Sequence, residues 1–510
     1  MENAVDGRTN DDAALQASPA TALITAAEGY PALERLALGA ERELLLSFRI
    51  FDPETRLHSD EARALGLSSW ADLAAHVAQQ GIDLRLLLTD FDPLFATDLH
   101  IDAWDAAEGF HAAAPEMKIL LHRHPARIGA VWRLALAPKI LSCINTIRQD
   151  GNEDRTPDIR PAMRRGRIYP ATLHQKMAIA DGDRMIIGGL DVDERRYDTP
   201  DHDQPSEETW HDVAVEVEGP IAAAGRRHFV ETWNAALAQR EAFDDTPVDL
   251  APMDLPPRVD PGPALRLLRT VSEPETGPFV FGPRTSHAEH EEAHLALFAK
   301  AERFIYIETQ FFRHAPLARA LAKAAERAPD LQCVMVLPVA PDIILFKGHR
   351  GLHARHAQAL QMRCLDRIRA AFGERLAVVV PARPGTGDSD VTYRGADIVY
   401  VHAKVTLVDD VHAIVGSANM NGRSMRWDTE ASVQVDDPAF ARGLRDRLVE
   451  HWLPDPAPSE DPTVAQTWAR RAAANAAHRP GARADFLLPY PATRTRAFSL
   501  YAPIVPAEMF

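Results

Sequence analysis

A single pattern of charged residues occurs twice in this chain, in segments 173–191 and 401–420. In each copy a histidine is followed by a lysine two positions later, an aspartate seven positions later and a glycine fourteen positions later. The residues are His174, Lys176, Asp181 and Gly188 in the first copy, and His402, Lys404, Asp409 and Gly416 in the second. Chance rarely produces two copies with the same offsets, so the pattern predicts that the 510 residues contain two related halves.

The sequence around each copy supports such a duplication. Residues 40–51 and 301–312 both start with Ala-Glu-Arg and continue into an apolar run of strand length. Further apolar runs follow at residues 82–90 and 331–338, each after a helical stretch. Strands that alternate with helices are typical of α/β layering, so we expect an α/β fold in both halves.

Each copy also has the pattern of a strand, a tight turn and a second strand. Asp181-Gly182 and Asp409-Asp410 are residue pairs that favour turns. Residues two apart on a strand share a face, so we expect each histidine to lie beside its lysine. Such a pair suits a phosphate group, because the ammonium neutralises the oxygens while the imidazole attacks phosphorus or protonates a leaving group. We interpret Asp181 and Asp409 as structural residues of the turns.

Composition and charge exclude several classes of protein. Acidic residues outnumber basic residues 73 to 56, and the net charge of −17 differs from the basic footprint that nucleic-acid binding needs. We therefore expect no nucleic-acid partner. The widely spaced Cys143, Cys333 and Cys364 give neither a disulfide framework nor a metal-binding pattern.

The sequence also bears on localisation. It contains no run of about 18 apolar residues, which argues against a membrane span. Its first residues are acidic and polar, and they lack the basic and apolar regions of a cleaved secretory signal. We expect a cytoplasmic or peripheral membrane protein, with secretion without a cleavable signal as the alternative.

Proline-rich stretches predict the domain organisation. Residues 1–20 have the composition of a disordered tail, and residues 247–263, with six prolines, that of an extended linker. The linker separates a first half at residues 21–246 from a second half at residues 264–453. A second proline-rich stretch then leads into residues 454–510, whose apolar end we expect to dock on the body of the protein.

These motifs resemble those of the phospholipase D superfamily, whose mark is two HKD motifs, each followed by small and polar residues. Five further runs are similar to its eukaryotic-type branch: residues 188–198, 209–220, 229–234, 303–312 and 416–430. The resemblance extends from about residue 36 to about residue 453. The chain departs from the family pattern at Gly189 and Asp191, where the minimal motif has serine and asparagine. It also departs at Thr309, where the branch usually has asparagine.

The resemblance implies a bilobal phospholipase D-like α/β fold, with two pseudo-symmetric α/β/α/β sandwich halves and the active site between them. It also implies a monomer, because the chain already contains a pair of halves. No N-terminal lipid-targeting domain is expected, so contact with a membrane surface has to come from the catalytic body.

The activity implied by the resemblance is hydrolysis of a glycerophospholipid, with phosphatidylcholine as the expected substrate and phosphatidic acid as a product. One histidine forms a phosphohistidine; the other protonates the leaving alcohol and then activates water, or an acceptor alcohol in a transphosphatidylation side reaction. We assign His174 as the nucleophile and His402 as the acid and base. The phosphoryl group would be held by Lys176, Lys404, Asp191, Ser417 and Asn419. No metal or other cofactor is expected, because the lysines supply positive charge.

Three alternatives to phospholipid hydrolysis stay open. A phosphatidyltransferase similar to cardiolipin synthase belongs to the same superfamily, as does a nuclease or other phosphodiesterase. The expected absence of membrane spans argues against the former and the acidic net charge against the latter. A non-catalytic lipid-binding scaffold is the third, and the two intact motifs argue against it.

The duplication also points to two further acidic residues. A catalytic histidine needs its second ring nitrogen held, and a carboxylate does this well. Aligning residues 213–217 with residues 431–435 places Asp212 opposite Glu430. We predict that Asp212 and Glu430 each orient one of the two catalytic histidines.

One helix-like segment has the spacing of a metal-binding face. The residues concerned are His287, His290, Glu291 and His294. A helix start in contact with solvent, capped by Ser286 and Glu289, is the interpretation that we favour over a metal site.

Two segments have the character of a lipid-contacting surface. Residues 342–351 place four apolar residues beside Lys347 and Arg350, which fits either a loop that enters a lipid interface or the end of a core element. Residues 123–147 combine basic residues with an amphipathic pattern. They fit either a helix over the entrance to the site or an ordinary packed helix.

Overall fold

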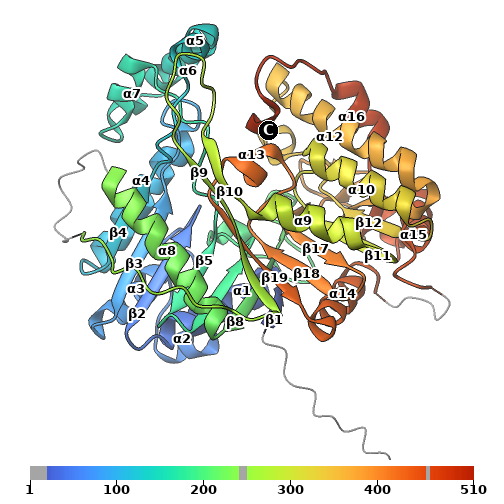
Figure 1. Ribbon diagram of the computed structural model, residues 1–510, viewed down its shortest axis with the longest axis horizontal. Coiled ribbons are helices and arrows are strands. Elements are labelled where there is room, and N and C mark those ends of the chain that lie inside the picture. Colours follow the sequence, from blue (N-terminus) through green and yellow to red (C-terminus); the bar gives the residue numbers. More distant parts are fainter. Residues whose placement is uncertain (1–19, 240–249, 455–459) are drawn as a thin grey trace, which may run out of the picture.

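The computed structural model describes residues 20–239, 250–454 and 460–510. In these ranges the chain forms two lobes that lie side by side, each built on one large sheet with helices packed against it (Figure 1). Almost all of the predicted tail, and parts of the predicted linker and C-terminal segment, lie outside the described residues.

The first lobe contains a seven-stranded sheet. Its strands lie in the order β1 (Ala20–Ile24), β8 (Val213–Glu218), β6 (Arg184–Gly188), β5 (Met177–Ala180), β2 (Glu43–Phe48), β3 (Asp83–Thr89) and β4 (Lys118–His122). β2, β3 and β4 run parallel, whereas the other neighbours are antiparallel. Helical crossovers between the parallel strands and a tight turn between β5 and β6 account for this mixture.

The second lobe repeats the arrangement within a nine-stranded sheet. Its order is β10 (Arg284–Ala288), β9 (Leu265–Glu273), β19 (Glu430–Asp436), β18 (His412–Gly416), β17 (Val405–Val408), β11 (Phe304–Glu308), β12 (Gln332–Val336), β13 (Leu376–Pro381) and β20 (Leu487–Pro489). From β19 to β13 the order and directions match those from β8 to β4. The predicted bilobal, pseudo-symmetric α/β fold is therefore confirmed.

Each sheet has an outer face covered by helices. These helices are α1 (Thr25–Leu38), α2 (Asp60–Ala64), α3 (Trp70–Gln79) and α4 (Thr97–Ala113) in the first lobe, and α9 (Glu289–Lys300), α10 (Ala315–Arg327) and α12 (Leu352–Phe372) in the second. Because both faces of the central strands are covered, their sequences are apolar almost throughout rather than alternating.

The inner faces of the two sheets share a single hydrophobic core. Side chains such as Leu45 and Met177 of the first sheet belong to the same buried cluster as Tyr306 and Val405 of the second. The helices α8 (Pro220–Gln239), α14 (Pro438–Trp452) and α15 (Ala465–Ala477) complete this core. The halves are thus packed face to face, which brings the ends of β5 and β17 together.

The strand prediction for the HKD histidines and lysines is wrong. β5 and β17 begin one residue after each lysine, so the histidine and lysine lie in the segment that enters the strand. These segments bond to the opposite lobe: the N–H groups of His174 and Gln175 donate to Thr429 O, and those of His402 and Ala403 donate to His211 O. The alternation of residues along a strand cannot predict that these segments form backbone hydrogen bonds with the opposite lobe.

The motif aspartates occupy the predicted turns in an identical way. Asp181 and Asp409 both have φ of 55°, in the left-handed region. The Asp181 carboxylate accepts three backbone N–H groups, from Glu41, Arg42 and Glu43, and the Asp409 carboxylate accepts those of Glu302, Arg303 and Phe304. Each carboxylate therefore ties its strand turn to the start of the neighbouring strand.

The predicted cap of the helix after Ser286 is wrong, and two of its histidines are buried rather than in contact with solvent. α9 begins at Glu289 after Ala288, and no side chain caps it, because Ser286 lies in β10 and donates to Val271 O. His290 and His294 are buried against the sheet, with ring nitrogens bonded to hydroxyl groups of Thr270, Ser432 and Thr406. Their nitrogens are thus already engaged.

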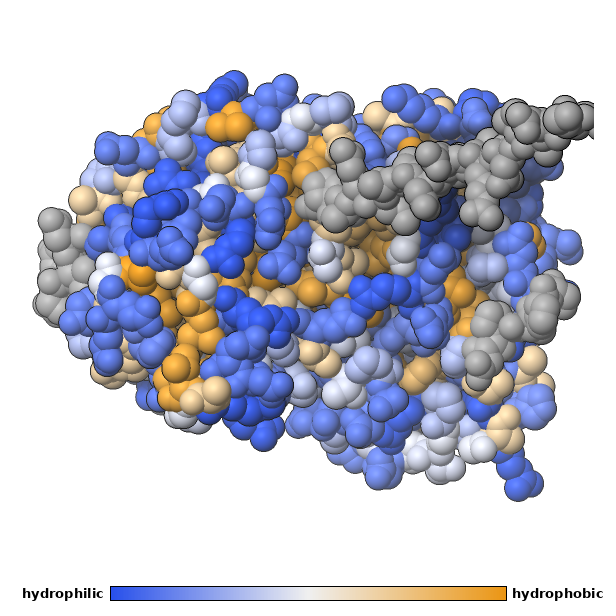
Figure 2. Space-filling model, turned by 90° about the horizontal axis from the view of Figure 1, so that it is seen from below, coloured by the Kyte–Doolittle hydropathy of each residue, from blue (hydrophilic) through white to orange (hydrophobic). Residues whose placement is uncertain are grey.

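Residues 123–147 form two short helices rather than one. These are α5 (Ala130–Ala135) and α6 (Ala137–Gln149), which project from one end of the first lobe together with α7 (Ile159–Arg165) (Figure 1). The opposite end of the molecule is covered mainly by hydrophilic residues with smaller apolar areas between them (Figure 2). Within the described ranges, no helix is both long and apolar enough to cross a membrane.

The remaining helical segments are short. Residues 342–351 contribute the single turn α11 (Asp342–Leu345), which is half-buried, while Lys347 is exposed. α13 (Gly422–Arg426) precedes β19, and α16 (Ala492–Phe498) packs on α12. The described part of the C-terminal segment thus belongs to the second lobe, through β20, α15 and α16.

Candidate active site

Each HKD histidine is held by a carboxylate from the opposite lobe. His174 Nδ1 donates to Glu430 Oε2 at 3.0 Å, and His402 Nδ1 donates to Asp212 Oδ2 at 2.6 Å. All four side chains are at least nine-tenths buried. Since Nδ1 is engaged in both rings, Nε2 is the nitrogen that each imidazole presents to a reacting group.

The two lysines lie beside their histidines, below the surface. Lys176 Nζ donates to His174 O at 2.6 Å, and Lys404 Nζ donates to His402 O. Burial lowers the pKa of Lys176 to about 8 and that of Lys404 to about 7. An anion bound between them would offset this loss of hydration and keep both ammonium groups protonated.

Two arginines that sequence reasoning did not single out join this cluster. Arg196 is buried and its Nη1 donates to Asp191 Oδ2 at 2.7 Å, while Asp191 Oδ1 lies 3.8 Å from Lys176 Nζ. Arg49, at the end of β2, has a buried Nε with no hydrogen-bond partner among the described residues. Its positive charge helps to hold the pKa of His174 low, after burial and Lys176. The site therefore gathers four cations.

The two lobes hold their histidines with different carboxylates, for a steric reason. Ser417 Oγ donates to Glu430 Oε2 in the second lobe. At the corresponding Gly189 of the first lobe, a Cβ atom would lie only 1.8 Å from Asp212 Oδ1. The shorter acid thus occupies the space of the missing side chain, which explains the departure at Gly189 from the minimal motif.

Asn419 lies at the floor of the site. Its Nδ2 donates to Gln310 Oε1 at 3.3 Å, and Gln310 Nε2 donates to Tyr400 OH at 3.0 Å. Asn419 Oδ1 is buried and has no hydrogen-bond partner among the residues that the structure describes. An unpaired buried amide oxygen is suited to accept a hydrogen bond from a ligand hydroxyl or from an ammonium group.

Electrostatics favour neutral imidazoles in the free site. Burial, followed by the neighbouring lysines, holds the pKa of both His174 and His402 well below the ordinary value. Burial also raises the pKa of Glu430 to about 8, while the charge of Lys176 and the hydrogen bond from Ser417 oppose this shift and favour the carboxylate. Neutral imidazoles with Nδ1–H bonded to a carboxylate have a free lone pair on Nε2, the form that a nucleophile requires.

The structure brings together all six residues that the sequence indicated as catalytic. The predicted phosphate ligands Asp191, Ser417 and Asn419 border the same cluster, whereas Asp181 and Asp409 lie in the turns. Sequence reasoning missed Arg49 and Arg196. The duplication could have indicated Arg49, because an alignment of residues 40–51 with residues 301–312 places it opposite another polar residue, Gln310. Arg196 aligns with Ser424 of the second half, so the duplication gave no signal for it.

The predicted metal-like face on α9 does not gather ligands. Among the described residues, a different group brings three possible ligand nitrogens together, namely His202, His211 and His451.

The chain resembles known proteins in both sequence and fold. A family model described as "Cardiolipin synthase, PLD-like domain" matches residues 295–452. Phospholipase D1 of Saccharomyces cerevisiae is 24% identical over 338 residues, which cover 51% of this chain and 20% of the yeast protein. Human Phospholipase D1 is 25% identical over 345 residues, covering 55% of this chain and 30% of the human protein. The chain thus spans less than a third of the length of these relatives.

Bacterial proteins extend the comparison. Cardiolipin synthase A of Pseudomonas entomophila is 26% identical over 280 residues, covering 54% of this chain and 46% of that protein. The crystal structure of phosphatidylserine synthase from Haemophilus influenzae Rd KW20 superposes with a TM-score of 0.51 over 85% of this chain and 86% of that chain. At 14% identity, this last likeness concerns the fold.

Proposed function

Because this chain belongs to the phospholipase D superfamily, we propose that it cleaves the phosphodiester bond of a glycerophospholipid, with phosphatidylcholine as the expected substrate. The observation that carries the proposal is the crossed pair of buried histidines, each held at Nδ1 by a carboxylate and flanked by a lysine. The site offers two Nε2 atoms, which suits a displacement at phosphorus in two steps.

In the first step His174 Nε2 attacks phosphorus. The Nε2–P bond forms while the bond from phosphorus to the head-group oxygen breaks, and that oxygen takes a proton from Nε2 of His402. His402 has to be protonated for this step, and the phosphate anion raises its pKa when it binds. The products are a phosphohistidine and the free head-group alcohol.

In the second step His402 acts as a base. Its Nε2 takes a proton from water, the resulting hydroxide attacks phosphorus, and the Nε2–P bond of His174 breaks to release phosphatidic acid. An acceptor alcohol in place of water gives transfer instead of hydrolysis. His174 is the more accessible of the two histidines, with a side chain 10% exposed against 2% for His402.

The cations of the cluster stabilise the charge on the phosphoryl oxygens. Lys176 and Lys404 are the direct partners that we propose, with Arg49 beside them and the Asn419 amide as an additional hydrogen-bonding group. Asp191 is already bonded to Arg196 and lies next to Lys176. A carboxylate repels a phosphate, so we assign Asp191 to the positioning of these cations rather than to direct contact with the phosphoryl group.

Transfer to a lipid hydroxyl is the second candidate function. Both the matching family model and the relative from Pseudomonas entomophila carry the name cardiolipin synthase. The same phosphohistidine serves both reactions, because only the acceptor of the second step differs. Incubation with phosphatidylglycerol in the absence of other alcohols separates them: phosphatidic acid indicates hydrolysis, and a lipid with two phosphates indicates transfer.

The experiment that tests the reaction uses phosphatidylcholine vesicles with 1-butanol. The native chain should form phosphatidylbutanol, and His174→Ala and His402→Ala should each abolish it. His478→Ala is the matched control, because this histidine is exposed at the end of α15. Activity that survives both active-site substitutions would overturn the proposal. Cleavage of DNA without cleavage of lipid would assign the site to a nuclease.

We further propose that the end of the molecule around α5 and α6 contacts the lipid surface. Four large apolar side chains are exposed there: Val131, Leu134, Leu141 and Phe279, which we call the apolar tip, are 42%, 78%, 59% and 76% exposed. Phe279 comes from the connection between β9 and β10 of the second lobe, and its carbonyl oxygen accepts Nε1–H of Trp132 at 2.9 Å. The tip is therefore shared by both lobes.

The charge around the apolar tip has the opposite sign to that of the chain. Residues 123–167 contain ten Lys and Arg residues against four Asp and Glu, a surplus of six positive charges in a chain of net charge −17. Basic and apolar side chains together favour an anionic or mixed lipid surface. This distribution supports a peripheral membrane location.

A small apolar cluster connects the tip to the active site. It consists of Ala171, Phe281 and Trp427, with Trp132 packed against it. Ala171 lies three residues before His174, and Trp427 lies three residues before Glu430. A lipid held at the tip would thus reach the site from the side on which His174 lies.

A further inference from the structure

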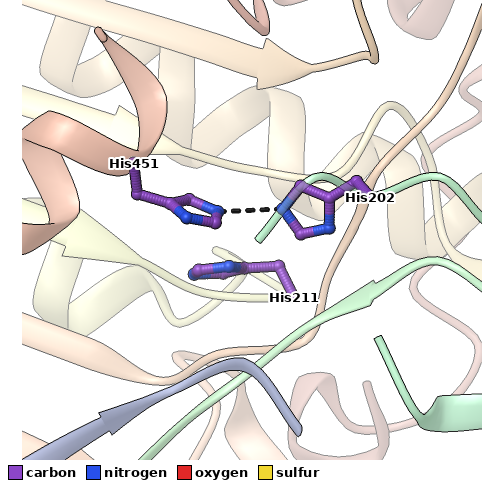
Figure 3. Close-up of side chains that lie close together, drawn as sticks. All are labelled: His202, His211 and His451. Atoms are coloured by element: carbon purple, nitrogen blue, oxygen red, sulfur yellow. Dashed lines mark hydrogen bonds between the residues drawn. The ribbon is translucent and has the colours of Figure 1, made fainter. Parts of the chain in front are cut away.

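Three imidazole rings converge beside the active site but outside the cluster of HKD residues (Figure 3). His202 lies in the segment before β7 (Trp210–His211), His211 is in β7 itself, and His451 is in α14 of the second lobe. One nitrogen from each ring lies within 4.8 Å of the others. His202 and His211 are fully buried.

Two of the rings are held from behind by carboxylates. His202 Nδ1 donates to Asp198 Oδ2 at 2.6 Å, and His211 Nε2 donates to Glu308 Oε2 at 2.9 Å. These bonds leave His202 Nε2 and His211 Nδ1 as lone-pair nitrogens. A carboxylate on the outer nitrogen is the arrangement that orients metal-binding histidines and strengthens them as ligands.

The inner nitrogens are incompletely satisfied by hydrogen bonds. His202 Nε2 and His451 Nε2 lie 2.8 Å apart and share one hydrogen. His211 Nδ1 is buried and has no hydrogen-bond partner in the described part of the chain. A buried ring nitrogen without a partner is costly in a folded protein, and a metal ion would satisfy it together with the other two.

From these contacts we propose that His202, His211 and His451 bind one zinc ion. Three imidazoles are a donor set that zinc prefers, with the fourth tetrahedral position left to water. The charges of Asp198 and Glu308 balance the two positive charges of the ion.

The surroundings of the three histidines fit a structural site. The ring of His202 stacks on Trp452, with ring centroids 5.7 Å apart, and Phe486 packs edge-on at 5.4 Å. Glu308 is fixed in turn by the OH group of Tyr306 and Nε1–H of Trp452. Such a rigid shell of aromatic side chains and hydrogen bonds holds the ligands in place.

The proposed ion would join the two lobes next to the catalytic histidine. His211 O accepts the N–H groups of His402 and Ala403 at 2.8 and 3.0 Å, and Asp212 follows His211 directly in the chain. The ion would thus fix the backbone that positions His402 and its carboxylate, without touching the substrate. Its binding does not depend on which reaction the active site performs.

The test is metal analysis of the full-length chain, purified without chelators and without added metal. We expect about one zinc ion per native chain, and the same for the His478→Gln control, but almost none for His451→Gln. Chelator treatment should lower the Tm of the native chain, and added zinc should restore it, while the Tm of His451→Gln responds to neither.

Two results would overturn the proposal. One is a native chain that contains no zinc as purified and does not bind added zinc in a titration against a chromophoric chelator. The other is zinc content in His451→Gln equal to that of the control. Should His451→Gln not fold, cobalt reconstitution of the native chain decides the matter, because three imidazoles give a tetrahedral cobalt spectrum and a histidine cluster without metal gives none.

Discussion

A substitution at Gly189 provides the sharpest test of the proposal that Asp212 and Glu430 each orient the histidine of the opposite lobe. In Gly189→Ser the new Cβ would lie 1.8 Å from Asp212 Oδ1 and 2.8 Å from its Cγ. The carboxylate has to retreat by about 1 Å or more, which lengthens its 2.6 Å bond to His402 Nδ1 beyond hydrogen-bond range. A misplacement of this size costs about 10²-fold in rate, and complete loss of an orienting carboxylate costs about 10⁴-fold.

The second lobe supplies the compensating change. There serine is paired with the longer acid, as Ser417 donates to Glu430, which still reaches His174 Nδ1. The double variant Gly189→Ser/Asp212→Glu copies that arrangement into the first lobe. We expect it to be at least about tenfold more active than Gly189→Ser alone, a coupling energy of about 1.4 kcal/mol.

The assay is kcat/KM for phosphatidylbutanol formation, measured together with the free energy of unfolding. Overpacking at Gly189 should cost about 1–3 kcal/mol, which leaves a folded protein to assay. Gly443→Ser is the matched control, since a Cβ at this exposed position of α14 meets no atom within 4 Å. Activity of Gly189→Ser within about threefold of the native value, or a double variant no better than the single one, would refute the steric argument.

Other parts of the structure give equally direct expectations. The pKa of Lys404 is low, about 7, so the free enzyme loses this positive charge as the pH rises, and kcat/KM should fall above about pH 7. The bound phosphate anion keeps the lysine protonated, so kcat should hold to higher pH. A kcat/KM that stays flat up to about pH 9 would contradict this. Asp181→Ala removes a carboxylate that accepts three backbone N–H groups and should lower the free energy of unfolding by about 2–4 kcal/mol, seen as a lower urea midpoint; a loss below about 0.5 kcal/mol would show that the turn does not depend on it. Leu134→Ser/Phe279→Ser should weaken sedimentation with anionic vesicles about tenfold or more, whereas Leu65→Ser, which changes another exposed leucine at the end of α2, should not; equal binding by the native chain and both variants would show that the apolar tip does not contact the membrane.

The duplication made most of the site predictable, because a repeat supplies its own alignment. It gave the histidines and lysines directly, and it placed Asp212 opposite Glu430 although neither is part of an HKD motif. It could not tell which acid serves which histidine. That pairing depends on His174 bonding to Thr429 across 255 positions of sequence, an exchange between lobes that no local spacing encodes.

The errors have local causes. The strand prediction for the HKD residues failed because the segments that enter β5 and β17 pair with the other lobe and not with their own sheet. The capping prediction at Ser286 failed because tertiary pairing with β9 drew this residue into β10, so that the helix started later. His202, His211 and His451 come from segments without any common spacing, and only the packing of α14 against the first lobe brings them together.

Each lobe supplies the carboxylate and a backbone hydrogen bond that the histidine of the other lobe needs. This has a consequence for a chain that is split into two fragments. A cut in the connection at residues 250–264, which contains neither helix nor strand, would yield two fragments that each carry one histidine and the acid required by the other fragment's histidine. Neither fragment alone would hold a complete active site, so activity would appear only when the two fragments associate. For the same reason, a substitution of the carboxylate in one lobe should impair the catalytic histidine of the other lobe.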